Sequence, residues 1–459
     1  MMESVTVATN GSRQAPIPEN PTAPDWIRTH PNPAVRDVVA ALSHLLAGTR
    51  PERQETGNTF AEKVLGVTPD SPLTAEQAPL TAITRITFGL VLADWITEHG
   101  AAVGPHGVPA PPSWTMEAFG EDTKFRLPQK LSAGFPAGTL ADVPVVIRFN
   151  GRGGYDANEL EVVARPSDQA VALEVLEKIR ETAKARNPYR GRWLRVTLSS
   201  GGKLGLLVET PPETSRDHIV ADETLWRELD LAIRSVAEDH ERLRAAGLGC
   251  RRGVLLSGPP GVGKSAVCAA VAAELHRDHG FTVLIADPKV GESALTTVMR
   301  QAAELAGDTG TAVILEDLDL FVPSDRRIGG RGLAELLAAL DAAPTTRLLT
   351  LASTNSVYLD KAAVREGRFD AKVAVAHPDR MTIEKLLSCF LQGLPEAAEV
   401  DVAAVAGMAA AGETSGAALR EAVRRAVLGG PVTTASLGTA VREMRARAEA
   451  AAPTDGSYL

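Results

Sequence analysis

The feature that most constrains this chain is the octapeptide GPPGVGKS, at residues 258–265, which stands between two apolar segments. Residues 253–257 before it predict a buried strand, and AVCAAVAAEL after it predicts an apolar helix. Glycines let backbone N–H groups turn inward around phosphates, and a helix N-terminus adds partial positive charge. The pattern G-x-x-x-x-G-K-[ST] in this setting therefore predicts a phosphate-binding loop, rather than a glycine-rich turn with an incidental lysine.

The same loop predicts how a nucleotide and its metal are held. Lys264 is expected to bridge the β- and γ-phosphates of ATP, and the Ser265 hydroxyl is expected to bind Mg²⁺. The residues that we expect to contact the bound nucleotide here are Gly258, Pro259, Pro260, Gly261, Val262, Gly263, Lys264, Ser265 and Ala266.

A second apolar strand, in the segment AVILEDLDLF, ends in a group of carboxylates. Ligands bind at the carboxyl ends of the strands in open α/β sheets, so we expect Glu316, Asp317 and Asp319 near the phosphates. By position, Glu316 is expected to bind the metal, and Asp317 is expected to polarise the attacking water. An acidic loop after a buried strand is the alternative interpretation.

The next strand ends in LASTN, which places Thr354 and Asn355 beside the acidic strand. A neutral amide at that place can orient water and detect the γ-phosphate without adding charge. Asn355 is therefore predicted to sense the nucleotide, although the segment taken alone would be a strand end with a turn residue.

The pattern along the chain divides it into several parts. Strands and helices alternate from about residue 215, which predicts an α/β fold with a parallel sheet covered on both faces. The predicted divisions are a disordered segment (1–30), a helical N-terminal region (31–112), a smaller α+β domain (113–214), the nucleotide-binding domain (215–379), a helical lid (380–448) and a flexible tail (449–459).

Charge and composition narrow the partners and the location. The 48 basic and 57 acidic residues give a formal net charge of −9, which argues against broad nucleic-acid binding because phosphate contacts need a basic surface. The three cysteines are widely spaced and predict neither a disulfide framework nor a metal site. Because the N-terminus lacks an apolar signal and no apolar run reaches about 18 residues, we expect a cytoplasmic protein without a membrane segment.

The segment AVREGRFDAKVAVAHPD, at residues 363–379, resembles the arginine-finger region of the AAA ATPases, which belong to the ring-forming AAA+ class. With the phosphate loop, the acidic strand and Asn355, the resemblance covers about residues 215–445. It implies an ATPase with an AAA+ core and a helical lid, assembled as a homo-oligomeric ring that we expect to be a hexamer. It also implies that Arg365 and Arg368 enter the neighbouring subunit's site and stabilise the charge of the transition state.

Three further comparisons with that family mark agreement and departure. GETSGAALREAVRRAV resembles the S-G-A-D-L stretch that closes over the adenine, so Gly416 and Ala417 are expected to pack on the base, with Ala418 where the family has Asp. The acidic pair reads Glu-Asp, whereas the family's usual order is Asp-Glu. In DPKVGES, Lys289 stands where the family has the aromatic residue that grips polypeptide in the pore, which argues against general threading.

The last residues, PTDGSYL, resemble the G-Q-Y-L ending of bacterial proteasome-associated ATPases. The resemblance implies that Tyr458 and Leu459 dock on a proteasome core, with a disordered end as the alternative. Taken together, the motifs favour an oligomeric ATPase that remodels or delivers a protein client in a chaperone-like manner. The alternative is a nucleotide-gated assembly scaffold with slow or no hydrolysis.

Overall fold

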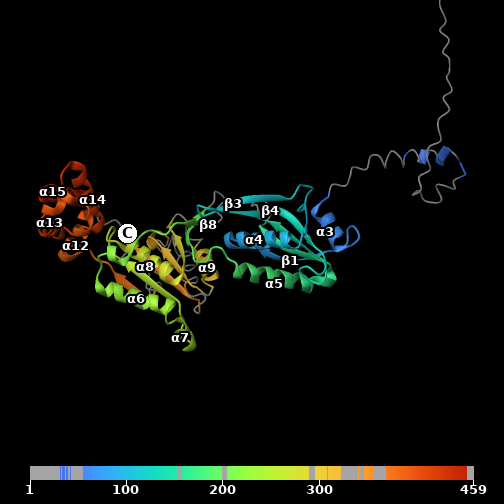
Figure 1. Cartoon of the computed structure of the whole chain (residues 1–459), viewed down its shortest axis with the longest axis horizontal. Coiled ribbons are helices and arrows are strands. Elements are labelled where there is room, and N and C mark those ends of the chain that lie inside the picture. The colour runs from blue at the N-terminus through green and yellow to red at the C-terminus, as the bar shows by residue number, and fades with distance from the viewer. Residues whose placement is uncertain are drawn as a thin grey trace, which may run out of the picture.

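The computed structural model describes residues 55–151, 158–198, 204–288, 295–307, 309–321, 346–355 and 368–451, together with residue 340 and isolated positions between 31 and 42. Figure 1 shows three parts in a row: an N-terminal sheet with helices, a second sheet covered by helices, and a helical region near the C-terminus.

The first part, called the N-terminal unit below, is built on an antiparallel sheet with the order β1-β6-β5-β4-β2, to which β3 is added by pairing with β4. Its helices pack on both faces of the sheet. The strands are β1 (Thr74–Pro79), β2 (Ala102–Gly104), β3 (Ser113–Phe119), β4 (Thr123–Phe135), β5 (Val145–Asn150) and β6 (Glu159–Ala164), and the helices are α3 (Gly57–Leu65), α4 (Ala82–Glu98) and α5 (Gln169–Ala185).

Alternation along β5 explains how this sheet is covered. Val146 faces α3 and packs with Phe60, whereas Ile147 and Phe149 belong to the core that α4 and α5 share with the sheet. Successive side chains of a strand point to opposite faces, so apolar residues at consecutive positions of β5 bury both faces. The N-terminal unit therefore has a layer of helix on each side of its sheet.

The region at 31–112, predicted to be helical, contains both helices and strands in the structure. The helix expected near residues 80–97 is present as α4, but the strands β1 and β2 also lie in this region. In the sequence TAEQAP of β1, Thr74 is the one β-branched residue and none is aromatic, and half of the positions are exposed at the sheet edge. Strand pairing with β6 overrides that weak local pattern. The helix expected at 34–46 falls largely outside the described residues.

The second sheet has seven strands in the order β13-β9-β12-β11-β10-β7-β8. All neighbours are parallel except the last pair, β7 and β8, which are antiparallel. These strands are β7 (Trp193–Leu198), β8 (Leu204–Glu209), β9 (Arg252–Ser257), β10 (Thr282–Ala286), β11 (Thr311–Leu315), β12 (Leu348–Thr354) and β13 (Ala371–Ala374).

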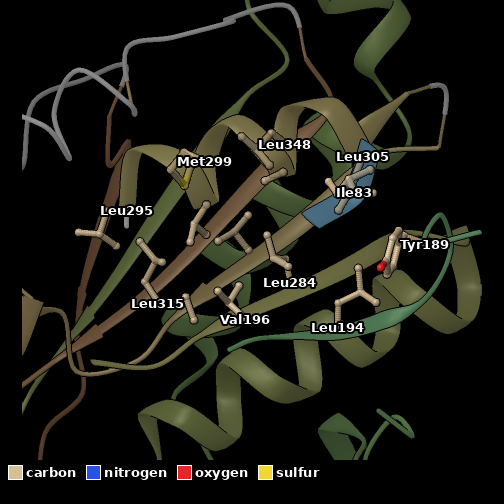
Figure 2. Packing of buried hydrophobic residues seen from close by; sticks show 14 of the residues in the cluster. Ile83, Tyr189, Leu194, Val196, Leu284, Leu295, Met299, Leu305, Leu315 and Leu348 are labelled. Carbon is tan, nitrogen blue, oxygen red and sulfur yellow. The ribbon is translucent and has the colours of Figure 1, made fainter. Parts of the chain in front are cut away.

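Helices cover both faces of this sheet, as the sequence predicts. On one face, α6 (Glu223–Ala237) and α8 (Lys264–His279) enclose a core with β9 to β12. On the other, α9 (Leu295–Ala306) packs over the same strands, and Figure 2 shows its Leu295, Met299 and Leu305 above Leu284 and Leu315 of β10 and β11. Two shorter helices, α7 (His240–Ala245) and α10 (Leu318–Phe321), complete this part.

The structure places the hairpin at residues 193–209 in the second sheet, although it precedes the predicted domain boundary at residue 215. The sequence placed 193–209 in the α+β domain, but β7 pairs in parallel with β10, and Leu194 and Val196 are buried in the core under α9. The hairpin itself is present as β7 and β8. Its alternating pattern indicates two strands, but it holds no information about the sheet that they join, which depends on distant partners.

The C-terminal helices form a body with its own core. α12 (Arg380–Leu391), α13 (Val402–Ala410), α14 (Gly416–Gly429) and α15 (Thr434–Ala451) bury a separate apolar cluster that includes Ile383, Leu419 and Leu437. The side chain of Asp379 accepts a hydrogen bond from the backbone N–H of Thr382 at 2.8 Å and caps α12 at its start. The α/β fold with a helical lid and a preceding α+β region is therefore confirmed.

Candidate nucleotide-binding site

Two glycines let the loop between β9 and α8 pack closely against its surroundings. A Cβ atom at Gly258 would lie 2.0 Å from the carbonyl oxygen of Val375, and one at Gly261 would lie 2.9 Å from the Ser415 Oγ. Gly261 also has a φ of 78°, in the left-handed region that favours glycine. The loop that the sequence predicts thus requires these residues, because any side chain would displace backbone or lid.

Lys264 begins α8 and is 6 % exposed. Its Nζ donates hydrogen bonds of 2.8 Å to the carbonyl oxygens of Gly258 and Pro259 and to Oδ1 of Asn355. Burial lowers the pKa of Lys264, while the charges of Asp317 and Asp319 act in the opposite direction. The ammonium group is therefore held by the loop itself and by the end of β12, where phosphates of a nucleotide would be bound.

The end of the acidic strand meets the end of β12. The Nδ2 of Asn355 donates to Oδ1 of Asp317 at 3.1 Å, so Lys264, Asn355 and Asp317 form one hydrogen-bonded chain. The backbone N–H of Asp317 donates to Oγ of the buried Ser353 at 3.1 Å, and Asp317 has a φ of 47°. The structure thus brings together the lysine, the amide and one carboxylate that the sequence selected.

Glu316 occupies a different place in the same turn. Its backbone N–H donates to the carbonyl oxygen of Ala286 in β10 at 3.3 Å. The pKa of Arg195 is raised mainly by its hydrogen bond to Glu209 and that of Cys268 mainly by burial, and the charge of Glu316 adds to both. The hydrogen-bonded chain from Lys264 reaches Asp317, in keeping with distinct roles for the two acids.

Asp319 is the residue whose role sequence reasoning missed. Its Oδ1 accepts hydrogen bonds from Oγ1 of Thr354 at 2.8 Å and from the backbone N–H of Asn355 at 3.0 Å. Asp319 lies in α10 and fixes the end of β12 from the side. The sequence shows it as a third carboxylate after the strand, but the reversal of the chain that turns it toward Thr354 cannot be seen in the spacing.

The lid touches the phosphate loop at the residues predicted to pack on the base. The backbone N–H of Ala417 donates to the carbonyl oxygen of Gly261 at 3.0 Å. Ser415 caps α14 by accepting from the N–H of Ala418 at 3.3 Å, which places Gly416 and Ala417 in the first turn beside the loop. A nucleotide held by this loop would therefore also meet the lid.

Arg368 lies at the other end of the sheet from the loop. It precedes β13, and its carbonyl oxygen is 2.0 Å from the position of a Cβ on Gly253, at the start of β9. Gly253 and Gly258 stand five positions apart, which corresponds to about 17 Å along a strand. This separation agrees with an arginine that does not serve its own loop. Arg365, Lys289, Tyr458 and Leu459 lie outside the described residues.

The donors that could hold a metal are oxygens. Ser265 is exposed in the first turn of α8, and Glu316 is half-buried after β11. A hydroxyl and a carboxylate suit Mg²⁺, which keeps several waters and binds substrate phosphates rather than a full cage of protein ligands. Within the described part of the chain, no group of three histidine, cysteine, aspartate or glutamate side chains could hold a metal ion.

The parallel sheet, the glycine loop before α8 and the buried lysine together define a P-loop nucleotide-binding domain with a helical lid. Residues 254–377 match the family model AAA, described as ATPase family associated with various cellular activities. Residues 254–377 are therefore similar to the AAA ATPase domain, and this family implies ATP binding.

Comparison with individual proteins also points to ATPases. The chain is similar to the ATP-dependent zinc metalloprotease FtsH 1 of Conexibacter woesei, with 33% identity over 217 residues that cover 44% of this chain and 32% of that protein. It is also similar to the human ATPase family gene 2 protein homolog B, with 31% identity over 51% of this chain and 32% of that protein. The aligned part is about a third of each relative's length.

Within the described residues, no helix combines the length and apolar character needed to span a bilayer.

Proposed function

We propose that this protein hydrolyses ATP as a homo-oligomeric ring, expected to be a hexamer, and uses the energy to remodel or deliver a protein client. The observation that carries the proposal is the hydrogen-bonded chain from Lys264 through Asn355 to Asp317 at the end of the parallel strands. The chain links a cation for the phosphates to a carboxylate that can act on water.

Each residue of the site has a separate task in this proposal. Lys264 leaves its loop carbonyls to bind the β- and γ-phosphates. Asn355 detects that change because its side-chain amide is hydrogen-bonded to the Lys264 Nζ. Asp317 polarises the attacking water. Ser265 and Glu316 hold Mg²⁺, which neutralises phosphate charge when bound. Gly416 and Ala417 close over the base.

In the proposed ring, a neighbouring subunit supplies the positive charge that stabilises the transition state. Arg368 lies at the far end of β9 from its own loop, so its guanidinium is assigned to a neighbouring subunit, together with that of Arg365. Such a finger is worth about 10³- to 10⁵-fold in rate in P-loop enzymes.

The test separates binding from hydrolysis. Lys264→Ala is expected to lose most ATP affinity, and Asp317→Asn is expected to bind ATP and turn it over very slowly. Glu316→Gln is the matched variant: if it abolished turnover with normal binding while Asp317→Asn remained active, the two carboxylates would have exchanged roles. Mixing Arg368→Ala with Lys264→Ala subunits should restore part of the activity, because each donates what the other lacks.

A scaffold that binds ATP and hydrolyses it slowly is the second candidate, favoured by the reversed Glu-Asp order and by Lys289. Steady-state ATPase activity measured against protein concentration distinguishes the two. Specific activity that rises with assembly supports the enzyme, and assembly with ATP without turnover supports the scaffold.

Docking on a proteasome core through Tyr458 and Leu459 is the proposal for delivery, and it rests on the final residues PTDGSYL. A pocket can hold the ring of Tyr458 and the terminal carboxylate, and several tails on one ring raise the effective concentration of a weak contact. Peptide hydrolysis by the core should rise with the intact ring and not with a ring that lacks the last two residues. Equal stimulation by both removes the tail from the mechanism.

A further inference from the structure

A cavity of about 610 Å³ lies between the N-terminal unit and the AAA domain. Its walls come from β1, α4 and α5 on one side and from α7, α9 and the start of β12 on the other. The two parts share an apolar core next to it, and Figure 2 shows Ile83 of α4 beside Leu305 of α9. The cavity is therefore bounded by both parts of the chain.

This cavity is separate from the nucleotide site. Thr346 and Arg347 line it and precede β12, whereas Asn355 follows the other end of the same strand. Arg347 and Asn355 stand eight positions apart, which corresponds to about 26 Å along a strand. A molecule bound here would not contact the phosphate loop.

Cationic side chains dominate the lining. Arginine and lysine contribute five of its residues, and Glu304 is its one carboxylate among the described residues; the five are Arg180, Lys184, Arg190, Arg244 and Arg347. This excess is local, because the whole chain has a net charge of −9. A concave wall of one charge sign concentrates ions of the opposite sign.

Arg190 gives the strongest sign of an anion site. Its Nε and Nη2 atoms are buried and have no hydrogen-bond partner within the described part of the chain. The guanidinium lies against Gly307, where a Cβ would be 2.7 Å from the Arg190 Cζ. Buried guanidinium N–H groups without acceptors are unfavourable, since these donors have left water without replacement. An oxyanion in the cavity would supply those acceptors.

Two further cations at this site come from different parts of the chain. Lys184 comes from α5 of the N-terminal unit, and Arg244 comes from α7 of the AAA domain; both are exposed. Arg347 is already engaged, because it donates to the carbonyl oxygens of Val236 and Ala237. A ligand with one phosphate could meet only part of this set, whereas several phosphates could meet Arg190, Lys184 and Arg244 together.

We propose that this cavity binds a small molecule or ion that carries several phosphate groups, and that the ligand joins the N-terminal unit to the AAA domain. The volume lies in the range of about 300–1,000 Å³ that is typical of small-molecule sites. The compact volume and the cationic lining favour a compact polyphosphate over an acidic peptide, which needs an extended groove.

The test is calorimetric titration of the full chain with tripolyphosphate, in saturating ADP and excess Mg²⁺ so that the phosphate loop is filled. Lys184→Gln and Arg244→Gln should each weaken binding about tenfold, because each removes a charged hydrogen bond to phosphate. Arg186→Gln is the matched control: it lies two residues after Lys184, is 68% exposed, contacts Asp94 and does not line the cavity. Its binding should equal that of the wild type.

Each alternative has its own outcome. If UTP binds more tightly than tripolyphosphate and Lys184→Gln weakens both to the same degree, the ligand is an organic phosphate. If UTP and tripolyphosphate bind with equal affinity, the ligand is inorganic polyphosphate. Absence of tripolyphosphate binding, an equal loss in Arg186→Gln, or orthophosphate binding of the same strength overturns the proposal. Tighter binding of a hexaglutamate peptide does so too and assigns the cavity to acidic protein segments.

Discussion

Replacing Asp319 by alanine should impair both stability and turnover while leaving nucleotide binding intact. Its carboxylate accepts from Oγ1 of Thr354 at 2.8 Å and from the N–H of Asn355 at 3.0 Å. Thr354 is fully buried, so loss of this acceptor should lower the free energy of unfolding by about 1–3 kcal/mol. Asn355 is exposed, and water can replace its lost partner.

The catalytic effect follows from the position of Asn355. Without Asp319 the end of β12 loses its lateral anchor, and the amide that joins Lys264 to Asp317 shifts. A misplacement of about 1 Å in such a group can cost about 100-fold in rate. The affinity for ADP should be unchanged, because Asp319 is not part of the phosphate loop.

Three measurements on Asp319→Ala check this reasoning: thermal unfolding without nucleotide, ADP affinity, and kcat for ATP. A melting point lower by about 2–4 °C per kcal/mol is expected. Asp319→Asn keeps an oxygen acceptor at the same place and should recover most of the stability and part of kcat. If the alanine variant retained wild-type melting and wild-type kcat, or if it lost ADP affinity as strongly as Lys264→Ala, Asp319 would not be the positioning residue described here.

Three further predictions concern packing, thiols and domain limits. Gly258→Ala should destabilise the protein by about 1–3 kcal/mol and abolish ATP binding, because the added Cβ would lie 2.0 Å from the Val375 carbonyl oxygen. Gly407→Ala in α13 is the control and should not destabilise the protein, because its Cβ would meet nothing within 4 Å. Chemical denaturation compares the two variants. Burial raises the pKa of the Cys268 thiol to about 12, so iodoacetamide at pH 8 should label the exposed Cys389 and spare Cys268; labelling of Cys268 in the native protein would contradict its burial. A fragment that starts at residue 186 should bind ADP, and one that starts at residue 215 should aggregate, because it leaves the β10 edge without β7; equal solubility of both would refute the importance of that pairing.

The residues of the candidate nucleotide site could be selected from the sequence because they lie in contiguous motifs. The loop around Lys264, the acid at Asp317 and the amide at Asn355 each follow an apolar strand, and parallel strands bring their carboxyl ends to one edge of a sheet. A family resemblance alone suggested that Gly416 and Ala417 pack on the base, and the hydrogen bond from Ala417 to Gly261 was not predicted. No local pattern places a residue of the lid beside a residue 156 positions earlier.

Long-range pairing explains what the sequence did not reveal. The edge strand β1 has weak strand propensity and is held by β6, which lies about 80 residues later in the chain. β7 and β8 show the alternation of a hairpin, but the choice between the two sheets depends on β10. The role of Asp319 depends on α10, a single helical turn that points it back at Thr354. The periodicity of apolar residues indicates local helices and strands, but it does not identify the distant residues that pair with them.

The place of β7 in the second sheet has a mechanical consequence. Residues 186–192 connect α5 to β7, and within this connection Tyr189 is 4% exposed and stacks on Phe119 with ring centroids 4.9 Å apart. The N-terminal unit is thus fastened to a strand of the ATPase sheet by a short, packed segment in place of a loose tether. In the proposed ATPase, any twist or shift of that sheet would move the N-terminal unit with it, because the packed connection leaves little slack between the two parts.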